Sequence, residues 1–420
     1  MKAGASSRNI TNPELIKGNP PVHDPLFAKV LVLDDSNTAV VFICVDVMSI
    51  YFQEGSLGAD GPERFREKFG IDHTFVNCTH THSDGRTGWT EEWRRTARQL
   101  VDEAVEEAYA NRVPVSLHAG RATSRVGSNR YGKPFTQESA PWVNTLEART
   151  EDGKPLAVLF EYAAHPVITI GAPGGLSADY PAYAVKRINE ELGDAIIPIF
   201  ALGCAGNANG DPVGFSITSG WHEKAEEAGR KLGDAVLAAM RDGAEITADK
   251  FTMRSETAML LLRAPGTQEW EEKVTRAKRD YPDDEWALKN LEVVKGIMER
   301  GEQPKLKFQV NGLTLGSEWL LVTMGAEMFS EYELWVNAFA PFKHTMVFGY
   351  TNGRIGYIPS DLALAGSIKY PRLAAKQGLE GGVSAALNEV RSTTHEVNLP
   401  FAVGTQKTLQ ERIAALWTDC

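Results

Sequence analysis

Residues 39–47, AVVFICVDV, constrain the fold most strongly, because this run is apolar on both faces of an extended strand. Such a strand needs cover on both sides, which places it in the centre of a sheet. Residues 26–33, LFAKVLVL, precede it, and the turn DDSNT joins the two runs, so the sequence predicts a hairpin. Another strand is expected over residues 73–80, HTFVNCTH.

Amphipathic helices alternate with these strands. Residues 90–112 have an acidic first turn, apolar positions at three- and four-residue spacing and a proline soon after, which predicts a helix. A helix over residues 180–193 and a buried strand over 195–203 follow the same alternation. This pattern predicts an α/β (mixed α+β) fold, with a large mixed β-sheet core flanked by helices.

The chain is predicted to form a single domain over residues 1–420, since it contains no internal repeat and no low-complexity linker. One highly charged segment, about 266–304, interrupts two strand-like runs at 251–262 and 307–324. We interpret it as a helical insertion of two helices, split near the YPDD sequence at 281–284.

Composition excludes several classes of protein. Lys plus Arg is 44 and Asp plus Glu is 55, giving a net charge of −11 without any long basic run, so nucleic acid is not an expected partner. No segment reaches the roughly 18–20 apolar residues of a membrane span, and the N-terminal segment lacks a signal-peptide core, so a cytoplasmic location is expected. The four cysteines lack CxxC spacing and are expected to be reduced. A small-molecule substrate is the expected partner, and a homo-oligomer is compatible with the sequence.

Two histidines one residue apart, His80 and His82, follow an apolar run in the sequence NCTHTHSDG. On an extended strand both would point to the same face, where neutral imidazoles are common zinc ligands. The alternative is two histidines hydrogen-bonded to loop carbonyls. Six other histidines stand singly and carry no such pattern: His23, His73, His118, His222, His344 and His395.

Two further strand ends carry residues suited to a site. His165 ends the apolar run LFEYAAH and directly precedes a proline, and strand ends are where sheets present ligands. The glycine-rich sequence GCAGNANGDP, residues 203–212, follows another strand but lacks the spacing of a dinucleotide-binding loop. Either its backbone amides form an oxyanion hole or substrate-shaping turn, or it is a tight turn that needs positive φ angles.

The sequences DPLFAKVLVLDD, NCTHTHSDG, VGSNR, YAAHPV, GCAGNANGD, MGAEMFSEYELWV and GYTNGRIGYIP occur in this order along the chain. From about residue 10 to residue 375, the chain thereby resembles the catalytic domain of the neutral/alkaline (non-lysosomal) ceramidases. The resemblance implies a mixed sheet with helices outside and a zinc ion at the bottom of a pocket. That family hydrolyses the amide of an N-acylated sphingoid base.

The resemblance implies four ligands for one Zn²⁺ ion: His80, His165, Glu327 and Tyr357. Two neutral nitrogens and one carboxylate leave the zinc with a net positive charge, which lowers the pKa of coordinated water to about 7. A tyrosine is an unusual fourth ligand, and it would bind as phenolate or move to the developing oxyanion.

Five more residues are expected at the substrate. By the resemblance, His82 faces the substrate as a proton shuttle, and Arg130 holds its carbonyl oxygen or oxyanion, with a surface ion pair as the alternative for the arginine. Tyr370, in KYP, lies near the place of a second active-site tyrosine. Asn209 stands where the ceramidases have a serine, and could donate a hydrogen bond to an oxyanion but could not act as a nucleophile. Asp84 adds a carboxylate at the pocket rim, which favours a polar substrate.

These observations predict a zinc-dependent hydrolase that cleaves an amide, or an ester or lactone, of a small polar molecule rather than ceramide. A metal-dependent lyase or isomerase, in which His82 or Asp84 removes a proton next to a carbonyl, is a competing hypothesis. A hydrolase with Cys204 as nucleophile is another, and a non-catalytic metal-binding protein is the last.

Overall fold

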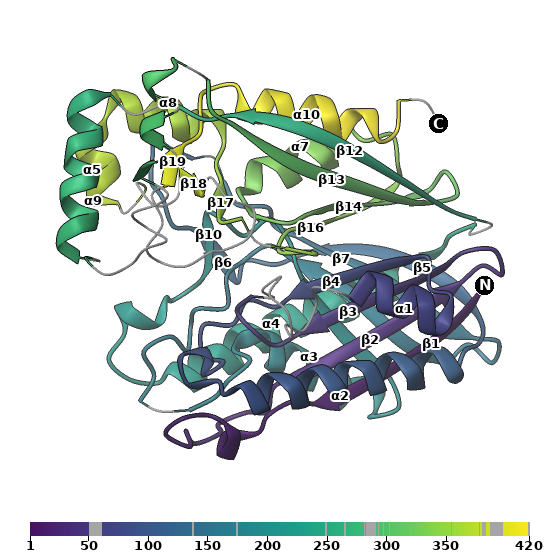
Figure 1. Ribbon diagram of the computed structural model, residues 1–420. Helices are drawn as coiled ribbons and strands as arrows, with labels where there is room; N and C mark the ends of the chain where they lie inside the picture. The colour runs from purple at the N-terminus through teal and green to yellow at the C-terminus, as the bar shows by residue number, and fades with distance from the viewer. Residues whose placement is uncertain are drawn as a thin grey trace.

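The computed structural model describes most of the chain. The described residues are 1–49, 61–136, 138–173, 175–247, 250–263, 266–280, 282, 291–292, 294–296, 298–301, 303–353, 355–377, 379, 384–386 and 398–418. Within them, two large β-sheets lie face to face and helices cover the outer sides (Figure 1).

The first sheet has nine strands, in the order β4-β3-β2-β1-β5-β7-β8-β9, and β11 pairs with β5. The β3–β4 and β8–β9 pairs are parallel and the remaining pairs are antiparallel, so the predicted mixed sheet is confirmed. The strands are β1 (Lys2–Asn9), β2 (Phe27–Asp34), β3 (Ala39–Val45), β4 (His73–Cys78), β5 (Val113–Thr123), β7 (Trp142–Thr150), β8 (Pro155–Tyr162), β9 (Ile197–Leu202) and β11 (Ala244–Glu245).

The second sheet has four strands, in the order β12-β13-β14-β16. These strands are β12 (Phe251–Leu261), β13 (Lys305–Leu315), β14 (Trp319–Met324) and β16 (His344–Phe348). Three two-stranded pairs complete the β-structure: β6 (Gly127–Asn129) with β10 (Ala208–Gly210), β15 (Glu327–Met328) with β17 (Tyr357–Ile358), and β18 (Ser384–Ala386) with β19 (Asn398–Pro400).

The described α-helices are α1 (Gly61–Phe69), α2 (Glu91–Ala110), α3 (Tyr180–Leu192), α4 (Trp221–Asp242), α5 (Thr267–Asp280), α7 (Ser330–Phe339), α8 (Asp361–Lys369), α9 (Pro371–Lys376) and α10 (Thr405–Ala415). Short 3-10 turns cover Pro13–Leu15, Arg86–Gly88 and Gly214–Ser216. Helix α2 is the helix expected from the acidic first turn, and the hydroxyl of Thr90 caps it by accepting a hydrogen bond from the Trp93 amide at 3.1 Å. None of the described helices is long and apolar enough to cross a membrane.

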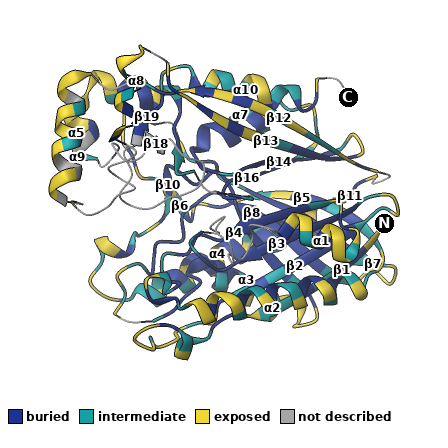
Figure 2. Ribbon diagram, in the orientation of Figure 1, coloured by how far each residue is buried: buried dark blue, intermediate teal, exposed yellow. Residues whose placement is uncertain are grey.

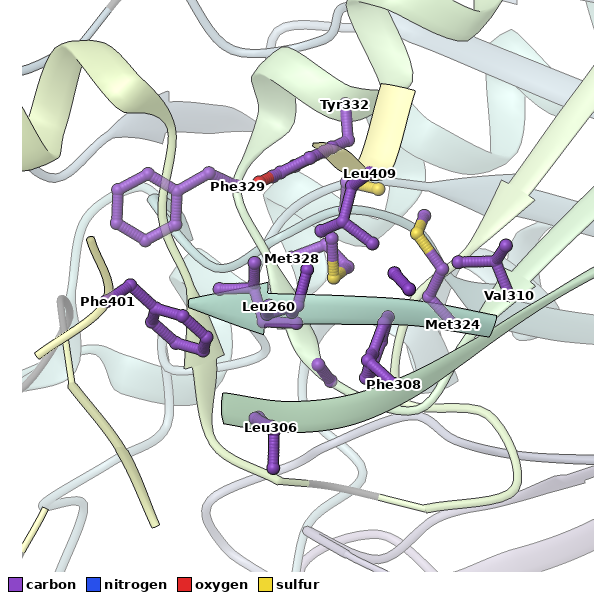
Figure 3. Close-up of a cluster of buried hydrophobic side chains, with 14 of the residues drawn as sticks. Leu260, Leu306, Phe308, Val310, Met324, Met328, Phe329, Tyr332, Phe401 and Leu409 are labelled. Carbon is purple, nitrogen blue, oxygen red and sulfur yellow. The ribbon is translucent and has the colours of Figure 1, made fainter. Parts of the chain in front are cut away.

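Apolar side chains fill three layers between these elements. Helix α2 packs on β1 and β2, whereas α3 and α4 cover β9, β5 and β7. Between the two sheets lies a core that includes Phe42 of β3 and Trp319 of β14. On the far side of the second sheet, Leu260 and Phe308 pack with Tyr332 of α7 and Leu409 of α10 (Figure 3). Most strand residues are therefore buried, while the helices expose their outer faces (Figure 2).

The local predictions agree with this architecture. Strands β2 and β3 form the expected hairpin, with Asp34 opposite Ala39, and β3 is fully buried as a central strand should be. The charged segment at about 266–304 falls between β12 and β13, which pair with each other, and its first helix is α5. The expected break near residues 281–284 lies outside the described residues except for Pro282. The single-domain organisation stays a prediction.

Candidate metal centre

His80 and His82 lie beyond the end of β4, not on it. The strand ends at Cys78, and His80 has a positive φ of 63°, held by a hydrogen bond from its amide to the Val47 carbonyl at 3.0 Å. The expectation that both histidines share one face of an extended strand is therefore wrong. They approach each other because the chain turns at His80, and their rings meet edge to face with centroids 5.0 Å apart.

The Nδ1 atom of His80 is anchored on the backbone. It contacts the carbonyl oxygen of Met48, and because a carbonyl only accepts hydrogen bonds, Nδ1 carries the proton. The lone pair of this imidazole is consequently on Nε2. Such backbone contacts are the usual means of orienting a histidine that binds a metal.

His165 is oriented in the same way by the glycine-rich loop. Its Nδ1 is 2.6 Å from the carbonyl oxygen of Ala205 and 3.1 Å from that of Ala208, which again leaves the lone pair on Nε2. The backbone of His165 also forms a β-bridge with Asn209. The sequence GCAGNANGDP was expected to be either a loop of free backbone amides or a tight turn with positive φ. Neither describes it, since the loop's carbonyls accept hydrogen bonds from His165 Nδ1.

The backbone amides of this loop form hydrogen bonds within the fold, and Gly206 allows a close backbone approach. The amides of Ala205, Gly206 and Gly210 donate to backbone carbonyls, so they do not form an oxyanion hole. None of the loop's glycines has a positive φ. A Cβ atom on Gly206 would instead lie 2.4 Å from the carbonyl oxygen of Glu327, so glycine is required there by the close approach of β15.

Glu327 reaches the two histidines from the other side. It is 1% exposed, and its Oε2 is 3.1 Å from His165 Nε2 and 3.5 Å from His80 Nε2. The parallel β15–β17 pair places Tyr357 directly beside it as its register partner. Three of the four ligands implied by the ceramidase resemblance thus meet at one point, and the fourth lies on the adjacent strand.

The donor set fits a divalent cation. With both Nδ1 atoms protonated, two imidazole lone pairs and a carboxylate oxygen face one another in a buried site, and a cation between them would remove the repulsion. Bonds of about 2.0–2.1 Å to tetrahedral zinc put ligand atoms ~3.4 Å apart. The observed separations of 3.1 and 3.5 Å agree with this arrangement.

His82 offers a third imidazole to the same point. One ligand atom from each of His80, His82 and His165 lies within 4.8 Å of the others. The Nε2 atom of His82 is buried and has no hydrogen-bond partner among the residues that the structure describes. Burial, followed by the neighbouring His80 and His165, lowers the pKa of His82 to about 2, which keeps this ring neutral and its lone pair available.

Arg130 lies at the phenol side of the site. Its Nη1 donates a hydrogen bond to the hydroxyl oxygen of Tyr357 at 3.2 Å, and its guanidinium lies over the rings of Tyr357 and Tyr131 at 5.3 and 4.9 Å. No carboxylate forms an ion pair with this exposed arginine in the described part of the chain. The alternative of a surface ion pair is therefore not what the structure shows.

Tyr357 itself is held as a neutral phenol by its surroundings. Burial and the charge of Glu327 raise its pKa above the usual value, although Arg130 acts in the opposite direction. Its ring stacks on that of His165, with centroids 6.3 Å apart.

Sequence reasoning missed Tyr350, which is fully buried against the histidines. Its hydroxyl is 3.3 Å from His165 Nε2, and its ring centroid is 4.5 Å from that of His80. Tyr350 has a positive φ of 52°. The aromatic residue in FGYTNG, just before a turn sequence, was the only signal for it.

Asn207 was also missed, and it joins three segments behind the site. Its Oδ1 accepts from the Ser330 amide at 2.7 Å, its Nδ2 donates to Glu331 at 2.9 Å, and its carbonyl accepts from the Arg130 amide at 2.8 Å. A buried asparagine with all these partners satisfied fixes the positions of the glycine-rich loop, α7 and Arg130 relative to one another.

Asp84 does not lie at a pocket rim as expected. It is fully buried, and its carboxylate accepts hydrogen bonds from the amides of Met48 at 2.7 Å and Arg86 at 3.0 Å. Burial raises the pKa of Asp84 to about 6. Asp84 is buried, not at a rim, because backbone donors and not solvent surround its carboxylate. Since Met48 also contacts His80, Asp84 holds the segment that orients this histidine.

The remaining predicted residues lie at different distances from the centre. Asn209 is half-buried on β10, next to His165 through the backbone bridge. Tyr370 is 41% exposed at the end of α8, and no contact among the described residues joins it to the histidines. Cys204 is fully buried, and burial together with Glu333 raises the pKa of its thiol well above the usual value, which argues against a cysteine nucleophile.

Two solved structures share this architecture. The neutral ceramidase of Pseudomonas aeruginosa superposes with a TM-score of 0.63 and 16% identity, over 90% of this chain and 73% of the ceramidase chain. A ceramidase complexed with C2 superposes with a TM-score of 0.66 and 14% identity, over 98% of this chain and 73% of the other. The chain has the fold of neutral ceramidases.

This fold likeness confirms the predicted fold class and the resemblance from which it was inferred. At 14–16% identity it carries the fold alone. Neither a protein-family profile nor a curated protein matches the sequence. Any function must consequently be argued from the arrangement of the side chains.

Proposed function

We propose that the chain is a zinc-dependent hydrolase that cleaves an amide bond, or an ester or lactone, of a small polar substrate. The observation that carries the proposal is the buried Glu327 Oε2, which lies 3.1 Å from His165 Nε2 and 3.5 Å from His80 Nε2, while both Nδ1 atoms are already engaged by carbonyls. One zinc ion would be held by these three residues and Tyr357. When bound, it would supply an acidified water molecule and a polarised carbonyl group.

Two residues around this centre are suited to different steps of hydrolysis. His82, with a buried and unpartnered Nε2 among the described residues, would orient the attacking water. Because its pKa is low in the resting protein, it would take the water's proton and pass it to the leaving group only as negative charge develops beside it. Arg130 presents a charged fork beside the Tyr357 hydroxyl, where it would hold the carbonyl oxygen as negative charge develops. These residues are the proposed catalytic groups.

The proposed substrate is polar because the groups around the centre are polar. Arg130 and His82 face the site, and half-buried Asn209 lies beside His165, where the ceramidases have their serine. Two alkyl chains would leave such groups without hydrogen-bond partners, at a cost of about 1–3 kcal/mol each. A small acylated amine, an ester or a lactone would satisfy them.

Metal analysis of the purified protein and of His80→Ala, His165→Ala and Glu327→Gln variants tests the ligand set. Each variant should lose the bound zinc and the hydrolysis of a panel of small N-acyl amines, aryl esters and lactones. His118→Ala is the matched control, because His118 lies on β5 and contacts Ser116 rather than the centre. Full zinc occupancy in both histidine variants would reject the proposal.

Product analysis in ¹⁸O-labelled water separates hydrolysis from the alternative of elimination. Hydrolysis places one labelled oxygen in the product carboxylic acid, whereas elimination or isomerisation incorporates none. Turnover without incorporation of label would assign the site to a lyase or isomerase.

A further inference from the structure

A second group of metal-binding side chains lies outside the centre described above. His23 and Asp24 precede β2, and His222 is in the first turn of α4. One ligand atom from each residue lies within 4.8 Å of the other two. The two imidazoles stack with ring centroids 3.3 Å apart and planes at 17°. Two nitrogens and one carboxylate oxygen from segments far apart in the sequence therefore meet at one place.

The hydrogen bonds of these residues leave donor atoms for a ligand. His23 uses Nε2 for the hydroxyl of Tyr183 at 3.1 Å, so its Nδ1 is available. His222 Nδ1 is buried and has no hydrogen-bond partner in the described part of the chain. Asp24 accepts from Ser177 at 2.6 Å and from the Ala178 amide at 2.7 Å, one bond at each oxygen, and each carboxylate oxygen accepts more than one.

The charges at this place favour a cation. Asp24 lies close enough to the carboxylates of Asp46 and Asp179 to feel their negative charge. No lysine or arginine among the described residues forms an ion pair with Asp24, whereas Glu223 lies close enough to His222 to act on its pKa.

Room for additional ligands is present beside Asp24. A cavity of about 660 Å³ is lined by Asp24 and Tyr183 and extends to Lys29 and Asp46 on the first sheet. Three protein ligands leave a coordination position open, and water molecules on the cavity side of Asp24 can complete the shell.

We propose that His23, Asp24 and His222 form a second divalent-metal site that joins the segment before β2 to the start of α4. Two imidazoles and one carboxylate suit Zn²⁺, Co²⁺ or Ni²⁺, whereas Mg²⁺ and Ca²⁺ prefer oxygen ligands alone. A metal lies in the plane of each ring that binds it, so binding at this site requires the stacked rings to rotate apart. This site is separate from the proposed catalytic centre and does not rest on it.

Calorimetric titration of chelator-treated protein with zinc chloride tests the proposal. The wild-type chain should bind two zinc ions, His222→Ala one, His80→Ala one, and the variant carrying both substitutions none. His118→Ala, a histidine outside both groups, should bind as the wild type does. Because His23 is exposed, His23→Ala repeats the test with little risk to folding if circular dichroism shows that His222→Ala is unfolded.

This experiment tests the two proposed sites independently. If His222→Ala and His23→Ala titrate like the wild type, the second site does not exist. If the wild type binds a single zinc that His222→Ala loses and His80→Ala keeps, the second site stands and the proposed catalytic centre fails. Zinc should also raise the melting temperature of His80→Ala, because a metal that binds only the folded chain stabilises it, and this increase should vanish in the double variant.

Discussion

Glu327 and Tyr357 are direct partners across the two-residue parallel β15–β17 pair. This pairing brings together a carboxylate that faces His80 and His165 and a phenol that accepts a hydrogen bond from Arg130. The two halves of the proposed site, the metal ligands and the substrate-binding arginine, are thus joined through one short stretch of backbone pairing.

Substitution of Tyr357 by phenylalanine tests this connection. We expect kcat/KM to fall by ~100-fold, because Arg130 loses its anchor and the proposed zinc ion loses its fourth ligand, an effect of about 3 kcal/mol. Tyr332→Phe is the control, since the hydroxyl of this fully buried tyrosine donates to the Pro359 carbonyl at 3.0 Å, away from the histidines. Equal losses in both variants would show that the effect is structural.

Asp84 is expected to act on the metal centre through the backbone. Asp84→Asn weakens the contacts to the Met48 and Arg86 amides, so we expect a loss of about 1–3 kcal/mol in the free energy of unfolding. Since Met48 contacts His80 Nδ1, zinc affinity should also fall by ~10-fold. Urea unfolding and zinc titration measure the two effects, with Asp242→Asn, at the exposed end of α4, as control. An unchanged zinc affinity would contradict the positioning role.

Gly206→Ala should separate β15 from the glycine-rich loop. The added methyl group would lie 2.4 Å from the Glu327 carbonyl oxygen and 2.8 Å from that of Met328, so the backbone must shift. We expect a loss of ~2–4 kcal/mol in unfolding free energy together with weakened zinc binding. Gly266→Ala, where nothing lies within 4 Å of the new methyl, should do neither. Normal zinc binding in Gly206→Ala would mean that the loop does not position Glu327.

Glu161→Gln should change how stability depends on pH. Glu161 is fully buried beside Glu333, and burial raises its pKa from 4.5 to about 7, although Asn144 donates to it at 2.8 Å. The unfolded chain ionises this group at lower pH than the folded chain does, so it costs stability progressively as pH rises from about 4.5 to about 7. Glutamine cannot ionise.

Urea unfolding at several pH values measures this effect. Relative to the wild type, Glu161→Gln should gain unfolding free energy between pH 5 and pH 8, where the wild-type carboxyl carries its penalty. A difference between the two proteins that stays constant over this range would show that Glu161 does not titrate there.

Local sequence patterns predicted the elements well where the signal lies within the element itself. The hairpin of β2 and β3 follows from two apolar runs and a turn sequence, and α2 from its acidic first turn and periodicity. The same reasoning was wrong for His80. Side chains two residues apart share a face only while the strand continues, and β4 ends at Cys78. It was also wrong for Asp84, whose burial depends on the amide of Met48 far along the chain.

By itself the sequence determined the chemical identity of the donors, the order of strands and helices and the resemblance in fold, because side-chain chemistry and periodicity are local properties. The resemblance implied that Glu327 joins two histidines from other segments, but only the tertiary structure decided how they approach one another, that Tyr350 lies against them, and that His23 stacks on His222. None of these contacts leaves a pattern within either segment, since each arises where separate strands and helices pack together.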